Sequence, residues 1–351
     1  MSLLSVCFKA IDGAWDQEVE NYPIDVYHLS GWLSASSIID KGQPQGIMVS
    51  YNHKKMFYPI IMREIASATE AGVTGWDATS TYGYGGPIVD ESLSQADINI
   101  MMQAAVDFLC EQGCVSWFIR LHPILNKDWN VDVGQTIQHG PTLVSDLTKS
   151  ADEHWQETQN RHRRGIRKAL KAEVITKIET LSPDNVQVFS GIYNETMTSV
   201  AANDYYFFDE CYFQQLCRQL PQRLLLITAN KDDSAIASSI YTTCEQTGIM
   251  QFHLGGTLEA GRQWQPSKLI THVARGWGRE AGYQFLHLGG GVGTNQDSLY
   301  EYKKGFSSNE LVFKTHRIIT NPKKYQALIK AAKHIDSEAA SDFFPLYRKP
   351  A

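Results

Sequence analysis

The chain has 351 residues, of which 43% are hydrophobic and 20% charged, a composition typical of a globular protein with two domains of roughly 150 residues. Its formal net charge of −6 argues against a general nucleic-acid binder. The six cysteines show no CxxC spacing, so we expect reduced thiols in a cytoplasmic protein. The amino terminus lacks a signal-peptide pattern and no apolar run approaches the roughly 18 residues that span a bilayer, so we expect no integral membrane association.

Apolar runs in the first 150 residues predict mainly β-strands. These strands lie at 47–51, 57–62, 73–76, 115–121 and 143–147. One helical pattern runs from about Ser94 to Gln112 and ends at Gly113. Ser150, followed three residues later by Glu153, forms a capping box. It predicts a helix that runs toward Lys171 and a domain boundary near residue 150.

The second half alternates helices and strands in a definite order. Helices are predicted at about 185–200 and 209–220, followed by strands at 224–229, 235–243 and 249–254. The next helix starts after Pro266 and ends at Gly282. A strand at 285–288, a short helix at 298–304 and a strand at 310–315 follow. This is the element order of a GNAT-type acyltransferase domain.

A short motif occurs twice in this half. His253-Leu254-Gly255-Gly256 recurs as His287-Leu288-Gly289-Gly290-Gly291, and each copy ends an apolar run. One long helix pattern separates the two copies. The arrangement describes a sheet that holds open a slot for an elongated donor, and it indicates group transfer.

The chain also resembles the FemAB/FemX-like branch of the GNAT superfamily, whose members join amino acids to cell-wall precursors. The resemblance rests on the segments 163–169, 266–270 and 76–87 and, above all, on 297–306, which is similar to the family's closing Leu-Tyr-x-Phe-Lys-x-Gly-Phe element. It implies an α/β (α+β) fold of tandem GNAT-like domains, each a mixed, mostly antiparallel twisted sheet flanked by helices. Residues 1–149, completed by 317–351, would form a degenerate first domain with acceptor contacts, and residues 150–316 a second domain with the donor site.

Amide formation by direct attack needs a neutral amine, an activated acyl donor and stabilisation of the developing oxyanion. Lys303 occupies the family's lysine position, which implies the oxyanion role, and Tyr302 replaces the aromatic residue beside it. The competing interpretation is a solvated lysine pair on a short helix. His253 and His287 are candidate bases or hydrogen-bond donors, although satisfied core histidines are commoner.

Donor binding is predicted around the two glycine motifs. A glycine lets a donor arm approach the sheet without a Cβ in the way, although glycines also simply end buried strands. The predicted donor-binding residues are Gly255, Gly256, Ser267, Lys268, Gly289 and Gly290.

Acceptor binding is predicted mainly in the first half. Two tyrosines in a glycine-rich loop commonly line a pocket for sugar or peptide groups, and packing between domains is the competing account. Asp77 could orient an amine, with Asp90 a weaker candidate, and Asp204 stands where relatives tend to carry an Arg-Asp pair that contacts acceptor phosphate. The predicted acceptor-binding residues are Trp76, Asp77, Tyr82, Tyr84, Gly86 and Asp204.

A basic run offers a binding site for donor phosphates. Arg163, Arg164, Arg167 and Lys168 would present positive charge along one helix, although such runs are often only solvated helix faces. The usual coenzyme A pyrophosphate loop is missing from residues 259–266, which weakens an acyl-CoA donor without excluding it. FemAB-like enzymes lack this loop too, so the resemblance implies aminoacyl-tRNA as donor. No tightly bound cofactor is expected, and the eleven dispersed histidines indicate no metal site.

The sequence therefore predicts an aminoacyl or acyl transferase that forms an amide on an amino group of a peptidoglycan or polysaccharide precursor. One alternative is an acyl-CoA-dependent N-acetyltransferase that acts on a nucleotide-linked amino sugar. Another is a non-catalytic RNA-binding or scaffold protein with the same fold, which the acidic charge balance disfavours. Expected partners are a small-molecule or glycan-precursor acceptor and the tRNA acceptor end as donor carrier, with no DNA.

Overall fold

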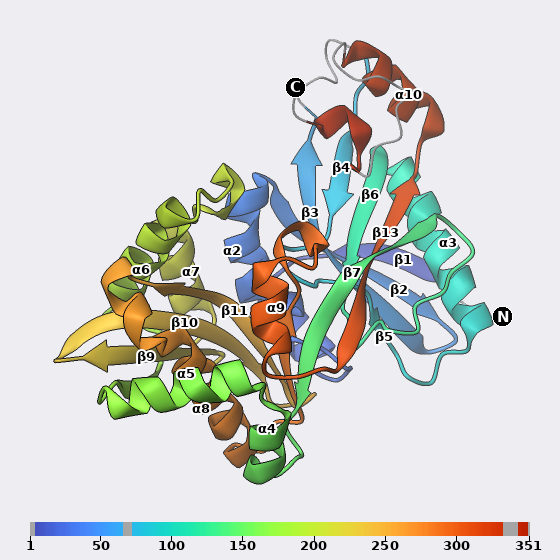
Figure 1. The fold of residues 1–351 in the computed structure, drawn as a ribbon. Helices are drawn as coiled ribbons and strands as arrows, with labels where there is room; N and C mark the ends of the chain where they lie inside the picture. The colour runs from blue at the N-terminus through green and yellow to red at the C-terminus, as the bar shows by residue number, and fades with distance from the viewer. Residues whose placement is uncertain (1–3, 66–71, 333–342, 350–351) are drawn as a thin grey trace. The chain divides into compact units, whose positions relative to one another are not determined.

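The computed structural model describes residues 4–65, 72–332 and 343–349 (Figure 1). The chain divides into two compact units, one formed by residues 1–139 with 313–351 and the other by residues 140–312. Both boundaries fall inside β-strands. Residues 333–342 of the predicted completing segment 317–351 lie outside the described residues. Among the described residues, no helix has both the length and the apolar character needed to cross a bilayer.

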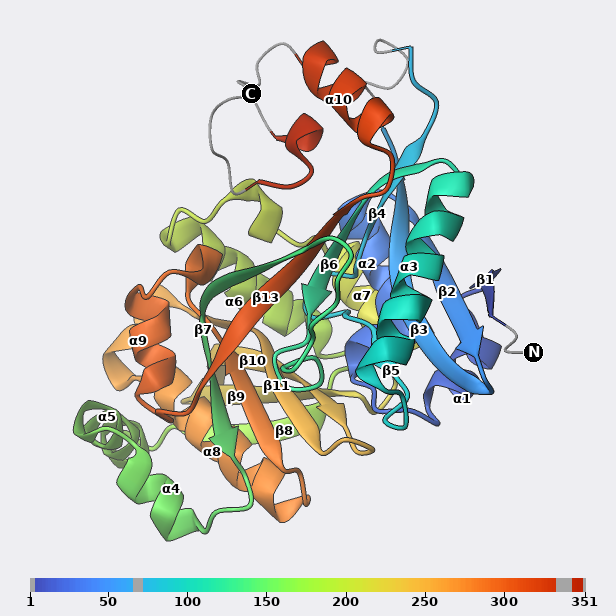
Figure 2. The ribbon, with the colours of Figure 1, turned by 90° about the vertical axis from the view of Figure 1, so that its right-hand side faces the viewer.

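The first unit is a mixed sheet with helices on its faces. Its elements are β1 (Ser5–Lys9), α1 (Gly13–Val19), α2 (Ser30–Asp40), β2 (Gln43–Tyr51), β3 (Lys54–Glu64), β4 (Trp76–Thr79), β5 (Ile88–Val89), α3 (Gln95–Glu111), β6 (Cys114–Leu121) and the first part of β7 (Gln135–Asp146), joined late in the chain by β13 (Glu310–Ile319) and α10 (Pro322–Ala331). The strand order is β1-β2-β3-β4-β6-β13, and β4 and β6 pair in parallel. Helix α3 lies on a face of this sheet (Figure 2). Its Met102 and Leu109 belong to the same buried hydrophobic cluster as Trp117.

The second unit repeats this plan. Its elements are α4 (Ala151–Glu157), α5 (Asn160–Lys171), β8 (Ile175–Thr180), α6 (Val186–Ser199), α7 (Glu210–Gln219), β9 (Leu224–Lys231), β10 (Ser234–Cys244), β11 (Ile249–Thr257), α8 (Pro266–Glu280), β12 (Phe285–Gly289) and α9 (Ser298–Lys304). The strand order is β7-β12-β11-β10-β9-β8, again with one parallel pair, β11 and β12. Helices α6 and α7 lie on one face of this sheet and α5 and α8 on the other (Figure 1).

Apart from the two-residue strand β5 and the helices α4 and α5, the two units share one order of elements: a strand, two α-helices, three strands, an α-helix and a strand. The parallel pairs occupy matching places, because β4 and β6 flank α3 in the first unit and β11 and β12 flank α8 in the second. The sixth strand comes from the other half of the chain. The end of β7 pairs with β12 in the second unit, and the end of β13 pairs with β6 in the first. The predicted fold class, tandem GNAT-like domains with mixed, mostly antiparallel sheets, is confirmed.

Local sequence signals place several elements correctly. The α9 helix covers the predicted residues 298–304, and α3 and α8 start and end within two residues of the predicted bounds. Ser94 and Ser150 both form capping boxes, and Asp297 caps α9 through its side chain. Each cap satisfies backbone N–H groups that a helix start leaves unpaired.

Several predicted elements are wrong in extent. Strand β7 begins at Gln135, eight residues before the predicted start, and β13 runs on to Ile319. The single helix from Ser150 to Lys171 is two helices, because Thr158 leaves the helical conformation and its Oγ1 donates to the carbonyl of His154 at 2.7 Å. The strand predicted at 73–76 is found at 76–79. Strand β11 does not end at the glycines but continues to Thr257.

Candidate active site

The parallel strands β11 and β12 separate partway along their length. They pair at Ile249–Phe285, Met250–Leu286 and Gln251–His287, and the pairing stops there. Beyond this point β11 continues beside β10, and β12 ends beside β7. The register between β10 and β11 shifts at the same place: Tyr241 faces Phe252 and Ile240 faces Leu254, so His253 is the extra residue of a β-bulge. Bulges of this kind bend a strand and redirect its side chains, and they are frequent next to active sites.

Lys303 reaches the place where the strands separate. Its Nζ donates to the carbonyl of Gly290, just after β12, at 2.6 Å. The same Nζ lies 5.5 Å from the ring centroid of Phe252, the first β11 residue beyond the last pair. The side chain is buried, with 7% of the residue exposed. The alternative of a solvated lysine pair therefore does not describe Lys303.

Burial lowers the pKa of Lys303 to about 8, and the carboxylate of Asp297 opposes this shift. An ammonium is costly to bury, so desolvation favours the neutral amine. Near neutral pH the group is still mostly protonated and keeps three N–H donors, of which the carbonyl of Gly290 accepts one. It can therefore offer a hydrogen bond to an oxygen that becomes negative nearby.

Tyr302 fastens α9 to α8. Its hydroxyl donates to the carbonyl of Ser267 at 2.9 Å and lies 3.0 Å from Oγ1 of Thr271. Its backbone carbonyl lies 2.8 Å from Nε2 of His162. Burial raises the pKa of Tyr302 to about 12, so the phenol stays protonated and keeps donating. These contacts position the neighbouring Lys303, and a direct catalytic role for Tyr302 stays a prediction.

The two candidate histidines differ in their surroundings. His253 lies 3.1 Å from the hydroxyl of Tyr212, and burial lowers its pKa to about 3, which makes it a weak base at neutral pH. His287 is 1% exposed, with Nδ1 2.8 Å from Oε1 of Gln251 and Nε2 2.9 Å from Oγ1 of Thr142. These contacts favour the alternative that both histidines are hydrogen-bonded core residues. The catalytic roles of His253 and His287 stay predictions.

The glycines of the two motifs serve close packing. A Cβ on Gly255 would lie 2.5 Å from Oγ of Ser239, and one on Gly256 2.8 Å from the carbonyl of Ile192 on α6. Gly289 has a φ of +75°, and a Cβ on Gly290 would lie 2.8 Å from the carbonyl of Pro141. These approaches explain why glycine occupies the positions, and donor binding there stays a prediction.

Replacing Gly256 with alanine is expected to destabilise the protein by about 1–3 kcal/mol, because the new methyl group overlaps α6. The matched control is Gly276→Ala within α8, where a Cβ meets nothing within 4 Å. Alanine gains helix propensity there, so we expect the control to be neutral or stabilising by up to about 1 kcal/mol. Urea unfolding of both variants measures the difference. Equal stabilities would contradict the packing described for Gly256.

A cluster of cations lies at the start of α8. Helix α5 packs against this end of α8, because Gly165 has no side chain and Lys268 fills the space beside it. Burial lowers the pKa of Lys268, and the nearby guanidinium groups of Arg161 and Arg164 lower it further. The start of a helix also favours anions. The cluster of Arg161, Arg164 and Lys268 is therefore suited to phosphate.

The four residues of the predicted phosphate site on α5 form two pairs. Arg163 and Arg167 contact α4, whereas Arg164 and Lys168 are exposed. Arg163 donates to the carbonyl of Trp155 at 3.1 Å, and the guanidinium of Arg167 lies 5.2 Å from the Trp155 ring centroid. Both hold α5 against α4. The loop before α8 is a 3-10 helix from Glu259 to Trp264, in agreement with the missing pyrophosphate loop.

Two of the predicted acceptor residues, Tyr84 and Gly86, are packed within the first unit. The Tyr84 ring makes edge contacts with Tyr27, His122 and Phe313 at centroid distances of 5.5–5.9 Å. A Cβ on Gly86 would lie 2.1 Å from Oδ1 of Asn126. Burial raises the pKa of the Tyr84 phenol, which therefore stays protonated.

The remaining acceptor candidates are Trp76, Tyr82, Asp77 and Asp204. Trp76 donates from Nε1 to the carbonyl of Gln112 at 2.9 Å, while Tyr82 is half-buried and accepts from Nε1 of Trp32. Asp204 is exposed in a short 3-10 turn. The Asp77 side chain is fully buried and already ion-paired to Arg63, so an acceptor amine could reach it only by displacing these contacts. Acceptor binding by these residues stays a prediction.

Sequence reasoning missed three buried features. Phe252 faces the ammonium of Lys303, and Arg275 is 1% exposed within the second unit. In the first unit, the fully buried side chains of Asp25 and His122 lie 3.0 Å apart. The second unit also has a cavity of about 350 Å³ between α4, β8 and α8 that includes none of the predicted site residues. In the part of the chain that the structure describes, no three His, Cys, Asp or Glu side chains are placed to hold a metal ion.

Comparisons with known proteins agree with this geometry. Residues 156–304 match the model of the acetyltransferase (GNAT) domain family. The crystal structure of FemX is similar with a TM-score of 0.68 at 14% identity, over 91% of this chain and 98% of FemX. The C-terminal domain of a putative lysylphosphatidylglycerol synthetase from Agrobacterium fabrum is similar with a TM-score of 0.56 at 13% identity, over 92% of this chain and 96% of that domain. No curated protein matches the chain.

Residues 156–304, less than half of the chain, are thus similar to a GNAT acetyltransferase domain. The chain as a whole shares the fold of the FemX structure. L-PGS from Bacillus licheniformis shares the fold as well, with a TM-score of 0.53 at 12% identity over 92% of this chain and 96% of that one.

Proposed function

We propose that the protein is an acyl or aminoacyl transferase that forms an amide on an amino group of a cell-envelope precursor. The observation that carries the proposal is the buried ammonium of Lys303, which lies where β11 and β12 stop pairing. The acceptor class follows from the resemblance of the sequence to enzymes that join amino acids to cell-wall precursors.

The reaction proceeds by direct attack within a ternary complex. The acceptor nitrogen forms a bond to the donor's carbonyl carbon, and the bond from that carbon to the leaving oxygen or sulfur breaks. The amine gives up a proton, and the leaving group becomes a free hydroxyl or thiol. Lys303 donates a hydrogen bond to the carbonyl oxygen as it becomes negative, which stabilises the transition state more than the ground state.

Two donors fit different features of the second unit. The 3-10 helix before α8 and the cluster of Arg161, Arg164 and Lys268 support a large phosphate-bearing donor such as aminoacyl-tRNA. The match of residues 156–304 to the GNAT acetyltransferase domain supports acyl-CoA as the donor. In that case the enzyme would transfer the acyl group to a nucleotide-linked amino sugar. We favour an aminoacyl donor because the usual pyrophosphate loop is absent.

The test supplies the purified protein with charged tRNAs and, separately, with a pool of acyl-CoA thioesters, each together with envelope precursors that carry free amines. We expect one donor class to lose its acyl group in step with the appearance of a new amide. Loss of acyl groups from acyl-CoA alone would replace the favoured donor by the alternative. If neither pool is consumed, and neither coenzyme A nor tRNA raises the melting temperature, the proposal fails.

The pH dependence of turnover is expected to report the ionisation of Lys303. The pKa of about 8 means that the ammonium is present below pH 8 and is lost as the pH rises through this value. The acceptor amine reacts in its neutral form, which becomes more abundant as the pH rises and so masks the loss of the Lys303 ammonium. This effect is the same in the wild type and in Lys303→Arg, so the ratio of their turnover rates isolates the ionisation of Lys303. Arginine stays protonated over this range. We expect the ratio to fall roughly tenfold per pH unit above pH 8, and a flat ratio from pH 6 to 10 would contradict the oxyanion role.

A further inference from the structure

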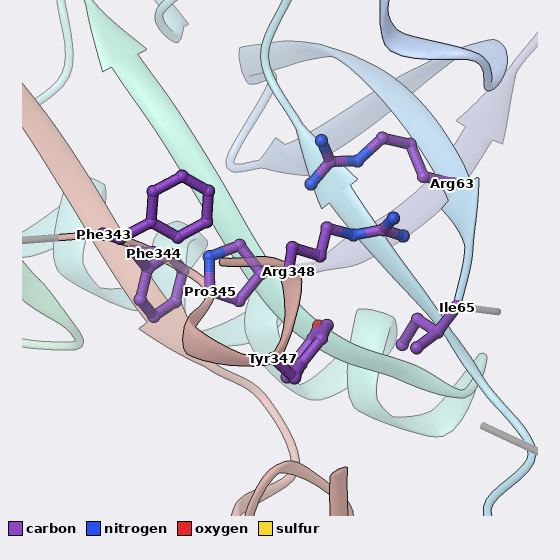
Figure 3. A pocket seen from close by; sticks show the side chains of 7 residues that line it. All are labelled: Arg63, Ile65, Phe343, Phe344, Pro345, Tyr347 and Arg348. Atoms are coloured by element: carbon purple, nitrogen blue, oxygen red, sulfur yellow. The ribbon is translucent and has the colours of Figure 1, made fainter. Parts of the chain in front are cut away.

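The first unit contains a cavity that none of the proposed chemistry uses. It has a volume of about 380 Å³ and lies between the end of β3 and the C-terminal segment. Figure 3 shows Arg63 and Arg348 extending toward each other from these two segments, with aromatic side chains beside them. The cavity is lined by Arg63, Ile65, Phe343, Phe344, Pro345, Tyr347 and Arg348. Volumes of this size are typical of small-ligand sites.

A buried carboxylate fixes the orientation of both arginines. Asp77 accepts from Nε of Arg63 through Oδ1 at 2.8 Å and from Nε of Arg348 through Oδ2. The hydroxyl of Tyr347 also donates to Oδ2, at 3.0 Å. The side chain of Asp77 is 0% exposed, so this support is part of the interior. Each guanidinium thus donates its Nε–H to Asp77, and among the described residues neither uses a terminal nitrogen in a hydrogen bond to that carboxylate.

The guanidinium charge around the cavity exceeds the carboxylate charge. Arg348 donates one terminal nitrogen to the carbonyl of Glu64, whereas the terminal nitrogens of Arg63 have no hydrogen-bond partner among the described residues. Arg120 and Asp40 lie within electrostatic range, and burial raises the pKa of Asp40, which favours its neutral form. Three arginines therefore face at most two carboxylates. A half-buried guanidinium with unused donors is a strong recognition element for phosphate.

The opposite wall is apolar and aromatic. Phe343 is 41% exposed although it is a large hydrophobic residue. Phe344 is held nearly parallel to Tyr325, with ring centroids 6.0 Å apart. An exposed phenylalanine beside a charged cavity offers a surface on which a flat ring can stack.

We propose that this cavity binds a phosphomonoester attached to a planar ring, in the manner of a nucleoside 5′-monophosphate. The phosphate, with a charge of about −1.5 to −2 at pH 7, lies against the terminal nitrogens of Arg63 and Arg348. The ring lies against Phe343. The site belongs to the first unit and is independent of the transfer chemistry proposed for Lys303 in the second.

Isothermal titration of the full chain with UMP and AMP tests the proposal, with uridine and ribose 5-phosphate as probes that lack the phosphate or the ring. We expect UMP or AMP to bind at least tenfold more tightly than either partial probe. Arg63→Gln is expected to weaken binding at least tenfold and Phe343→Ala three- to tenfold. Lys127→Gln and Phe207→Ala change exposed residues outside the cavity and are expected to leave the affinity unchanged.

Phe343→Ala keeps the test decisive if Arg63→Gln fails to fold, because Phe343 is exposed and Asp77 retains both arginines. The proposal is overturned if neither nucleotide binds below about 1 mM. It is also overturned if binding persists unchanged in Phe343→Ala, or if the control variants weaken it equally.

Discussion

Replacing Lys303 with alanine is expected to lower turnover by about 100- to 1000-fold, which is the usual effect of removing one donor to a developing oxyanion. The Nζ–carbonyl contact with Gly290 and the placement over Phe252 put the ammonium at the end of the β11–β12 pairing. Steady-state rates with the donor identified above measure the effect. The loss should appear in kcat as well as in kcat/KM, because the interaction forms mainly in the transition state.

Lys304→Ala is the matched control for this prediction. Lys304 is the next residue on α9, but its ammonium pairs with Glu310 at 3.1 Å and lies near the surface. We expect its turnover to stay within about twofold of the wild type. Similar losses in both variants would point to damage to α9 as a whole, and unchanged turnover in Lys303→Ala would remove the proposed mechanism.

Stability separates a catalytic role for Lys303 from a structural one. Its pKa is about 8 in the folded protein and 10.5 ordinarily, so the unfolded chain binds more protons between these values. The free energy of unfolding therefore rises with pH in this window, and below pH 8 the buried charge costs stability in full. Lys303→Met is thus expected to melt at the wild-type temperature or higher at pH 7. A marked fall would show that the lysine serves mainly to hold the fold.

Much of the second unit could be predicted because its signals are local. Each signal lies in or next to the element that it predicts. Examples are the proline at the start of α8, the side-chain cap of Asp297 on α9 and the apolar runs of β9 to β12. The first unit was harder, because α1, α2 and β1 carry few periodic apolar residues. Strand β8 was missed because it lies at the edge of its sheet, where Ile175 is 71% exposed.

The site could be predicted only in part, because its decisive contacts are distant in sequence. The position of Lys303 follows from a short motif, but its contact with Phe252 depends on the bulge at His253. No local sequence pattern predicts that bulge. The break between α4 and α5 is similar, since Arg275, which binds Thr158 at the break, lies 117 residues away. The cavity at Arg63 joins segments 284 residues apart.

Replacing Arg275 with methionine is expected to destabilise the protein by roughly 3–5 kcal/mol. The guanidinium is 1% exposed and donates to the carbonyl of Phe306 at 2.7 Å, to the carbonyl of His154 at 3.0 Å and to Oγ1 of Thr158 at 2.6 Å. Hydrogen bonds from a charged group contribute more than neutral ones, and methionine would remove the guanidinium donor to the carbonyl of Phe306. Burial lowers the pKa of Arg275 to about 10, so the charge is kept at neutral pH.

Arg279→Met, one turn further along α8, is the control, because Arg279 forms an ion pair with Glu280 at 3.2 Å and its side chain is 33% exposed. We expect it to lose less than 1 kcal/mol in urea unfolding. The difference between the variants measures the buried network of Arg275. Equal losses would show that this network adds little.

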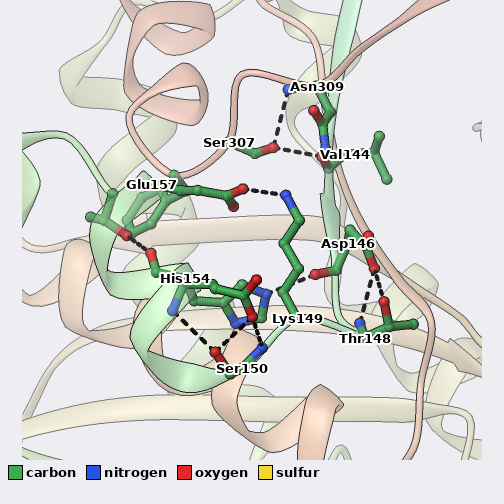
Figure 4. A network of polar contacts seen from close by, with 12 residues as sticks. Val144, Asp146, Thr148, Lys149, Ser150, His154, Glu157, Ser307 and Asn309 are labelled. Carbon is green, nitrogen blue, oxygen red and sulfur yellow. Dashed lines mark hydrogen bonds and ion pairs between the residues drawn. The ribbon is translucent and has the colours of Figure 1, made fainter.

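The network explains why Arg275 should also matter for turnover. Figure 4 shows the contact of His154 with Asp146, which helps to fix the start of α4 after β7. The backbone N–H of Ser150 also donates to the carboxylate of Glu153, at 2.8 Å. Arg275 joins the end of α4 to Phe306, three residues after Lys303. Losing this link should free the end of α9, so residual turnover of Arg275→Met is expected to fall several-fold below that of Arg279→Met at a temperature where both are folded. Equal turnover would mean that Tyr302 alone holds Lys303 in place.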